Sequence, residues 1–491
     1  MSFWYQNGVC SNKEHSHRRG HKYARQGAGA LTILCTLGGV VWAQDVPPGL
    51  VARFDVTQRL EYSDNPDFDV DGESDFFGRT ILGFGLDSVT NVQRFSLNLG
   101  TDIEEGRENE SSINVDNSFA NLRYNRNTRN ALLGAFLGYR ETDTETSFFD
   151  DFDPGGSGFS FFDLFDPDGS SNDSGNVINQ DSGTRKTYRY GLDWAIGREA
   201  PIGASFNWSY NEITYSDTND PDLTDQSTND FRGQVDFLIS PRITTSLTGE
   251  YIDFNAQDNG VNRETTRLGV ATTLEINPIL TADIGLSYDT IERTGDETGT
   301  DKGTSVDLGL VRAMTNGSVG VRFRSDVESN DNGRRSFLSV DREMELPRGA
   351  LSYSLGLTGA GDVIGTDPLV NVNYLHQLST ATLEFGMSQN VNVDSDNDEQ
   401  LNTAVRAAYN QQINNTSSFS VDAVFFDRND LSATDDDGQR IDLRLSYRHD
   451  LTRDWGLVSG ISHDRTLEDD GDDRRRTTVF VGLQRSFDWR P

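Results

Sequence analysis

The sequence has little cysteine, little lysine beyond its start, and no long apolar run. Its 491 residues include two cysteines, Cys10 and Cys35. Both fall in a stretch with the features of a leader, so the rest of the chain has no thiol for a disulfide framework or for thiolate chemistry. The apolar run "GALTILCTLGGVV" is shorter than the about 20 residues that a membrane-spanning helix requires.

Residues 1–43 are predicted to be a secretory signal peptide that is removed. A positively charged region precedes the apolar run, and Val41-Trp42-Ala43 fits a small-residue cleavage site before Gln44. The alternative is a membrane anchor, for which the run is too short. We therefore expect a signal peptide at 1–43 and one domain at 44–491.

The expected mature chain is strongly acidic. Without the leader's five basic residues and Glu14, 38 basic residues remain against 77 acidic ones, a net charge of −39. A nucleic-acid partner is excluded, because binding to phosphate backbones depends on positive charge. Only two of the basic residues are lysines, Lys186 and Lys302, and the others are arginines. We expect no cofactor.

Apolar and polar residues alternate along much of the chain. In "FSLNLGTDI", Phe95, Leu97 and Leu99 share one face, and in "RIDLRLSYR" Ile441 and Leu443 do the same. A period of two is typical of strands with one apolar and one polar face. No convincing helical stretch occurs outside the leader.

The segments between strands alternate between short and long. Short ones include 88–92, 240–243 and 276–279, whereas 64–75, 217–230 and 293–302 are long, acidic and rich in Gly, Asn and Asp. Short turns at one end and long loops at the other indicate an all-β, single antiparallel transmembrane β-barrel. A soluble β-sandwich array or a β-helix is the alternative, but neither requires this alternation.

We predict about 22 strands, with 18–24 as the range, and both chain ends at the short-turn end. The strands include Leu50–Tyr62, Phe77–Ser88, Arg94–Ile103, Gly456–Arg465 and Arg476–Phe487. The first begins within about seven residues of the cleavage site. We therefore expect no plug domain, which argues against an energised siderophore receptor.

Many arginines fall on the polar face of the expected strands, which faces the lumen. These arginines could form a charged conduit, because guanidinium groups bind anions and rings of arginine tune anion passage. Alternatively, they form ladders with carboxylates on neighbouring strands and brace the wall. The candidates for lumen-lining residues are Arg53, Arg59, Arg79, Arg94, Arg189, Arg232, Arg267, Arg322, Arg324, Arg406, Arg440, Arg444 and Arg448.

The loop at about 142–185 is the longest and has an unusual composition. Its segment 148–169, "FFDDFDPGGSGFSFFDLFDPDG", combines seven phenylalanines with six aspartates. It could be a surface loop, a constriction or lid, or a partner site, since large apolar patches usually contact something. The constriction candidates are Phe148, Phe149, Asp150, Asp151, Asp153, Phe159, Phe161, Phe162, Asp163, Phe165, Asp166 and Asp168.

Signals for metal binding and catalysis are weak. "DPDG" (166–169) and "DDDG" (435–438) offer oxygen ligands to a divalent cation but lack the full spacing of a calcium loop, so metal binding stays open. His449 and His463 each precede an aspartate, as a barrel hydrolase would use. Neighbours in a strand point to opposite faces, and we expect no enzymatic activity.

The leader, the acidic hairpin loops and the final "TVFVGLQRSF" (478–487) resemble Gram-negative outer-membrane β-barrel proteins. Among these proteins, the sequence pattern is most similar to the β-barrel porin family associated with capsular or exopolysaccharide export. That resemblance implies the cell outer membrane, contacts with its lipid and lipopolysaccharide, and insertion by the barrel-assembly machinery.

The leading functional hypothesis is therefore a pore for passive passage or export of polar or anionic solutes, with polysaccharide as a candidate cargo. A structural or surface-interaction protein with a loop-filled lumen is the alternative, and a barrel hydrolase is the weakest hypothesis.

Overall fold

The computed structural model is a single closed sheet of 22 antiparallel strands. It describes residues 49–70, 72–106, 114–144, 183–218, 223–257, 261–295, 298–328, 333–361, 367–393, 399–431, 437–468 and 473–490. In these ranges no helix is long and apolar enough to cross a membrane.

Each strand pairs with the next along the chain. The first half comprises β1 (Gly49–Ser63), β2 (Asp75–Val89), β3 (Gln93–Glu105), β4 (Asn114–Asn127), β5 (Ala131–Asp143), β6 (Thr184–Ile196), β7 (Ile202–Ser216), β8 (Gln226–Ser240), β9 (Ile243–Ala256), β10 (Val261–Asn277) and β11 (Leu280–Gly295). The second half comprises β12 (Gly299–Met314), β13 (Gly317–Val327), β14 (Arg334–Leu346), β15 (Gly349–Ala360), β16 (Asp367–Gln377), β17 (Ala381–Val393), β18 (Glu399–Asn414), β19 (Ser417–Asp430), β20 (Gly438–Asp450), β21 (Trp455–Glu468) and β22 (Asp473–Trp489).

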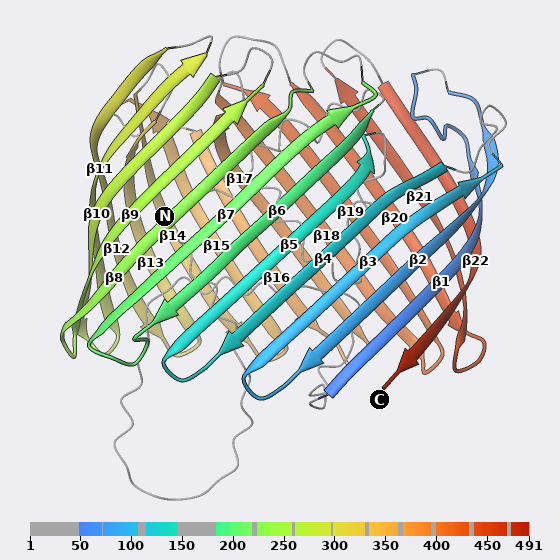
Figure 1. The fold of residues 1–491 in the computed structure, drawn as a ribbon, viewed down its shortest axis with the longest axis horizontal. Helices are drawn as coiled ribbons and strands as arrows, with labels where there is room; N and C mark the ends of the chain where they lie inside the picture. The colour runs from blue at the N-terminus through green and yellow to red at the C-terminus, as the bar shows by residue number, and fades with distance from the viewer. Residues whose placement is uncertain are drawn as a thin grey trace, which may run out of the picture.

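The pairing of β1 with β22 closes the ring. It is antiparallel and runs from Ala52 opposite Trp489 to Ser63 opposite Thr478. Figure 1 shows β1 in blue beside β22 in red, with the start of β1 and the end of β22 at the end of the barrel where the turns are short. Closure leaves no strand edge unpaired, which a wall inside lipid requires. The predicted antiparallel barrel of about 22 strands is thus confirmed.

Connections alternate in length as expected. β8 and β9 are joined by Pro241 and Arg242 alone, whereas β1 and β2 are separated by residues 64–74. In bacterial outer-membrane barrels the short turns face the periplasm and the longer loops face outward. We therefore call the two ends of the barrel periplasmic and extracellular.

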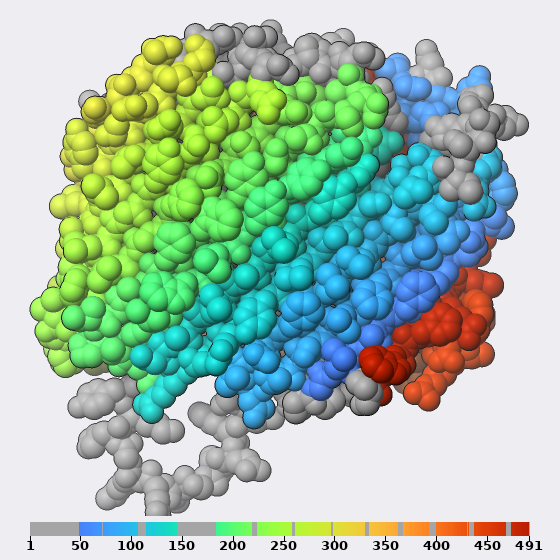
Figure 2. Space-filling view, viewed as in Figure 1, coloured from blue at the N-terminus to red at the C-terminus, as the bar shows by residue number. Residues whose placement is uncertain are grey.

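The two faces of each strand differ in polarity. On β1, Phe54 and Leu60 are 41% and 50% exposed, whereas Thr57 and Glu61 on the other face are 7% and 4% exposed. Exposed apolar residues follow this parity around the ring, and Figure 2 shows their strands packed into a continuous outer surface. The apolar face is therefore the outer, lipid-facing one, and the polar face is the inner one.

The β1–β22 seam depends on a glycine, which gives a first prediction. Gly482 lies opposite Arg59, and a Cβ there would lie 2.4 Å from the Gln58 backbone oxygen and 2.8 Å from the Arg59 side chain. Gly482→Ala should therefore strain the seam, at a cost of about 1–3 kcal/mol. The check is the temperature at which the folded band is lost on SDS gels, which should fall.

Gly233→Ala is the matched control. Gly233 also lies within a strand, and nothing lies within 4 Å of the position its Cβ would take. Equal unfolding temperatures for the two variants would contradict this account of the seam.

Candidate functional site

The inner wall beside the seam holds a compact cluster of charges near the extracellular end. It consists of Arg59 and Glu61 on β1, Arg79 on β2, and Asp102 and Glu104 on β3, and we call it the seam cluster. These residues meet because β1, β2 and β3 are consecutive, and alternation places their inward positions next to one another.

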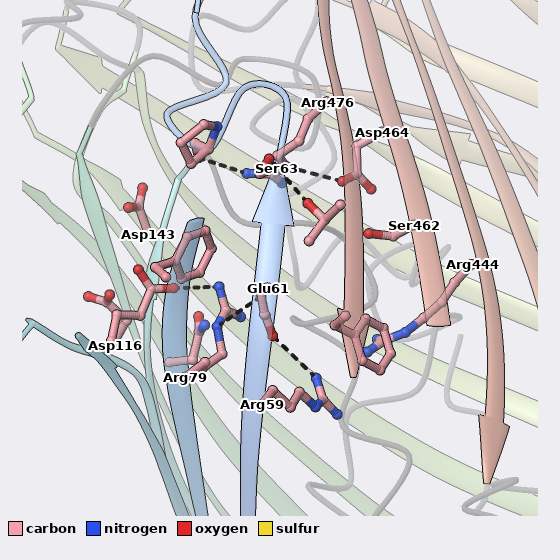
Figure 3. Close-up of a pocket in the computed structure, with 16 residues that line it drawn as sticks. Arg59, Glu61, Ser63, Arg79, Asp116, Asp143, Arg444, Ser462, Asp464 and Arg476 are labelled. Atoms are coloured by element: carbon pink, nitrogen blue, oxygen red, sulfur yellow. Dashed lines mark hydrogen bonds and ion pairs between the residues drawn. The ribbon is translucent and has the colours of Figure 1, made fainter. Parts of the chain in front are cut away.

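Arg79 is the centre of the seam cluster. Its Nε lies 3.6 Å from Glu61 and its Nη1 lies 3.8 Å from Asp102, while its Nη2 donates to Glu104. Figure 3 shows Glu61 and Arg79 turned toward one another, with Arg59 below them. One guanidinium thus contacts carboxylates from two neighbouring strands, which holds three strands in register.

The cluster continues across the seam onto β22 through an aromatic ring. The Arg59 guanidinium lies over the Phe480 ring at 4.6 Å, and Arg444 of β20 approaches the same ring at 5.7 Å. A ring between two guanidinium groups forms favourable cation–π contacts where no carboxylate is needed. Gly482 leaves the room in which Arg59 crosses the seam.

The start of the β1–β2 loop covers the extracellular end of the seam. Asp64 and Thr477 exchange two hydrogen bonds, from Asp64 N to the Thr477 carbonyl at 3.2 Å and from Thr477 N to the Asp64 carboxylate at 2.5 Å. Arg476 donates to the Pro66 carbonyl and lies over the Phe68 ring at 4.9 Å. Phe68 is 1% exposed at a φ of 53°, so its burial sustains a backbone conformation that side chains rarely adopt.

A small cavity lies between these groups. Its volume is about 60 Å³, and its lining includes Arg59, Glu61, Arg79, Asp464 and Arg476. That is room for a few water molecules, whereas pockets for small-molecule ligands span about 300–1,000 Å³. The cavity is therefore too small to be a ligand pocket.

A second group of ion pairs runs across β8 to β11. Arg232 lies opposite Glu250, which lies opposite Arg267, which lies opposite Asp289. The contacts measure 2.7 Å from Arg232 to Glu250, and 3.0 Å from Arg267 to both Glu250 and Asp289. Alternating charges on four adjacent strands form the cross-strand ladder that was the alternative to a charged conduit.

The other candidate arginines have different surroundings. Arg322 lies opposite Gly309 and Ser339, and Arg189 donates to Asn211 at 3.0 Å. Each of the remaining six lies near a carboxylate: Arg53 with Asp488, Arg94 with Asp87, Arg324 with Asp326, Arg406 with Asp422, Arg440 with Asp442 and Arg448 with Asp450. Their role in selecting a solute stays a prediction.

The candidate lumen-lining residues leave out four buried arginines, among them Arg335 and Arg476. Arg335 is 1% exposed and pairs with Glu328 at 3.3 Å and with Glu399. Arg335 lies on β14 and Glu399 lies on β18, and three strands, β15 to β17, separate them in the sheet. The ion pair therefore joins two parts of the extracellular rim that are not adjacent in the sheet. Arg335 and Arg476 stand in runs, "RRS" and "RRRT", where parity is ambiguous at a strand end.

Several predictions lie outside the described residues. These are the signal peptide 1–43, "DPDG" and the constriction candidates from Phe148 to Asp168. Where the chain is described, no group of three or more His, Cys, Asp and Glu side chains could hold a metal ion.

The histidines proposed for a hydrolase lie on the outer face. His449 Nδ1 and the Ser417 hydroxyl are 2.8 Å apart, and His463 Nδ1 lies 3.1 Å from the Thr477 hydroxyl. Asp450 and Asp464 point to the inner wall, where they pair with Arg448 and Arg476. Neither histidine is therefore joined to the aspartate that follows it.

No family model matches the sequence. No curated protein matches it either. Among solved structures, the barrel is similar to the FrpB iron transporter from Neisseria meningitidis, with a TM-score of 0.53 at 8% identity over 89% of this chain and 82% of that one. It is also similar to the ferric-catecholate import receptor Fiu from E. coli, with a TM-score of 0.53 at 10% identity over 88% of this chain and 81% of that one.

A third similar structure is a variant of the ferric enterobactin receptor PfeA from Pseudomonas aeruginosa, in complex with enterobactin. The TM-score is 0.51 at 9% identity, over 90% of this chain and 82% of that one. At these identities the likeness concerns the fold. The protein is an outer-membrane β-barrel of 22 strands.

The predicted pore for passive passage or polysaccharide export is wrong. The similar solved structures reported above are an iron transporter and import receptors. The physical reason lies in the wall: most candidate arginines are neutralised by carboxylates, so the inner face lacks the single-sign charge of an anion conduit.

The seam cluster yields the second prediction. Arg79→Met leaves Glu61, Asp102 and Glu104 close together without their shared cation, and breaking a buried pair costs about 3–5 kcal/mol. The midpoint of urea unfolding of the purified barrel should fall accordingly.

Arg94→Met is the control for Arg79→Met. Arg94 is also paired, with Asp87 at 3.5 Å, but the two side chains are 62% and 40% exposed. Exposed pairs contribute about 0–1 kcal/mol. If both variants shifted the midpoint equally, burial would not explain the stability of the cluster.

Proposed function

We propose that this chain is the barrel of an outer-membrane receptor that imports a ferric catecholate or a similar iron chelate. The observation that carries the proposal is the closure of 22 antiparallel strands into one ring. Similarity of fold to an iron transporter and to a ferric-catecholate import receptor supports it.

Strand number connects the fold to this function. With strands about 4.8 Å apart and tilted by about 40°, a ring of this size is roughly 44 Å across. Porins of about 16–18 strands enclose an aqueous channel, whereas 22-stranded outer-membrane transporters have a plugged lumen. An open lumen of this width would pass most small solutes, so selective import requires that protein fills it.

This requirement departs from the sequence-based expectation of a barrel without a plug. The described residues form the wall and leave that expectation untested. The paired inner wall is compatible with a filled lumen, because its charges are neutralised by one another and need no solvent to balance them. A protein element could therefore pack against it without leaving unpaired charge.

The third prediction concerns uptake. A strain lacking this protein, grown under iron limitation, should lose saturable uptake of radioactive iron carried by a tricatecholate chelator, and a plasmid copy should restore it. Uptake should also stop when a protonophore collapses the energy supply, since import through a closed receptor does not proceed by diffusion. The measurement is cell-associated iron against chelate concentration.

A small neutral sugar, followed in the same cells, is the control for general permeability. Its entry should be unchanged by the deletion. Iron uptake that stayed linear with concentration and indifferent to the protonophore would contradict the receptor proposal, as would equal uptake by the deletion strain.

A further inference from the structure

Near the periplasmic end, charge is segregated between the two faces of the wall. In the half of each described strand nearer its short turn, the charged residues on the outer face are all arginines: Arg126, Arg312, Arg342 and Arg485. Carboxylates of the same region, such as Asp283, Asp341 and Glu343, fall on the inner face. Each strand could have placed either sign on either face, so the separation requires an explanation.

Two of these arginines lie close together. Arg312 on β12 stands opposite Val319 on β13, and Val319 stands opposite Arg342 on β14. With strands about 4.8 Å apart, the two Cα atoms are roughly 10 Å apart. Tyr353 on β15 stands opposite Arg342 and extends the row. Two long side chains at this separation can converge on one group lying above Val319.

The two guanidinium groups are held differently. Arg342 donates from Nη1 to the Ser318 carbonyl and from Nη2 to the Asn316 side chain, both at 2.9 Å, which turns it toward the periplasmic turn. Arg312 is exposed, and no carboxylate among the described residues pairs with it. One arginine is thus oriented in advance and the other is available for a ligand.

The row lies at the edge of the apolar surface. Leu310 and Met314, which flank Arg312 on the outer face, are 46% and 45% exposed, and Val340 beside Arg342 is 46% exposed. A ligand bound here would contact the apolar, lipid-facing surface of the barrel on one side and water on the other. Aromatic residues such as Tyr353 favour this interface.

From this arrangement we propose that Arg312, Arg342 and Tyr353 bind the phosphate of an anionic phospholipid in the periplasmic leaflet. Arginine suits this ligand, because its planar fork donates two hydrogen bonds to a phosphate. An anionic membrane surface attracts arginine and repels carboxylate, which accounts for the segregation of charge. The inference is independent of which solute the barrel imports.

The fourth prediction tests the site by native mass spectrometry of the purified full-length barrel in detergent. Dimyristoyl phosphatidylglycerol is the probe. Arg312→Gln should weaken its binding about five-fold, as expected for one arginine at an anionic surface. Arg342→Gln could also loosen the β12–β13 turn, so the test uses the Arg312→Gln variant. An unchanged unfolding temperature of that variant shows that it is folded.

Arg123→Gln is the matched control. Arg123 is exposed and near the same end, on β4, but it stands opposite Ser96 and Phe136 on the inner face. The substitution Arg123→Gln removes the same charge as Arg312→Gln and should leave lipid binding unchanged. Equal loss in both variants would overturn the proposal, because net charge alone would then explain it.

Two further probes distinguish the source of the phosphate. Dimyristoyl glycerol has the same chains and no phosphate. It should bind to the wild-type barrel and to the Arg312→Gln variant with the same, weak affinity. Inorganic phosphate at millimolar concentration should not displace the phospholipid. The phospholipid site would be refuted if dimyristoyl glycerol bound the wild-type barrel as tightly as dimyristoyl phosphatidylglycerol does. Displacement of the phospholipid by free phosphate would also refute it.

Discussion

The structure depends on one constraint: inside lipid, every backbone N–H and C=O must find a partner within the protein. Twenty-two strands meet this constraint only if the last pairs with the first, and the register of β1 with β22 from Ala52 to Ser63 does so. Small features of the seam follow from it. Gly482 gives the two backbones room, and the segment from Asp64 to Phe68 fastens their extracellular ends through Thr477 and Arg476.

Closure also determines where charge can be placed. Once one face of every strand meets lipid, ionisable side chains are favoured on the inner face, where desolvation penalises any that lack a partner. The ladder from Arg232 to Asp289 and the carboxylates around Arg79 satisfy this demand with opposite charges on adjacent strands. The inner arginines are therefore primarily braces of the wall, which is the alternative that the sequence left open.

Period-two alternation and loop lengths were sufficient to predict the barrel, its strand number, and the short-turn end as the place where the first strand begins and the last one ends. They succeeded because both signals are local and repeated many times. The charge network was less predictable: Arg335 and Glu399 pair although they stand on strands that are not neighbours, and strand order gives no signal for such a contact. Function was predicted least well, since residue types on a wall do not reveal which charges cancel one another.

The same separation by face operates at the outer surface, with the opposite outcome. On the inner wall a carboxylate beside an arginine lowers the energy of both. On the outer wall near the periplasm, a carboxylate would meet lipid phosphates of its own sign, and only arginine gains from that neighbourhood. The four outer arginines, among them Arg312 and Arg342 on either side of Val319, and the carboxylates behind them thus follow from one rule: the solvent on each side of the sheet selects the charge that faces it.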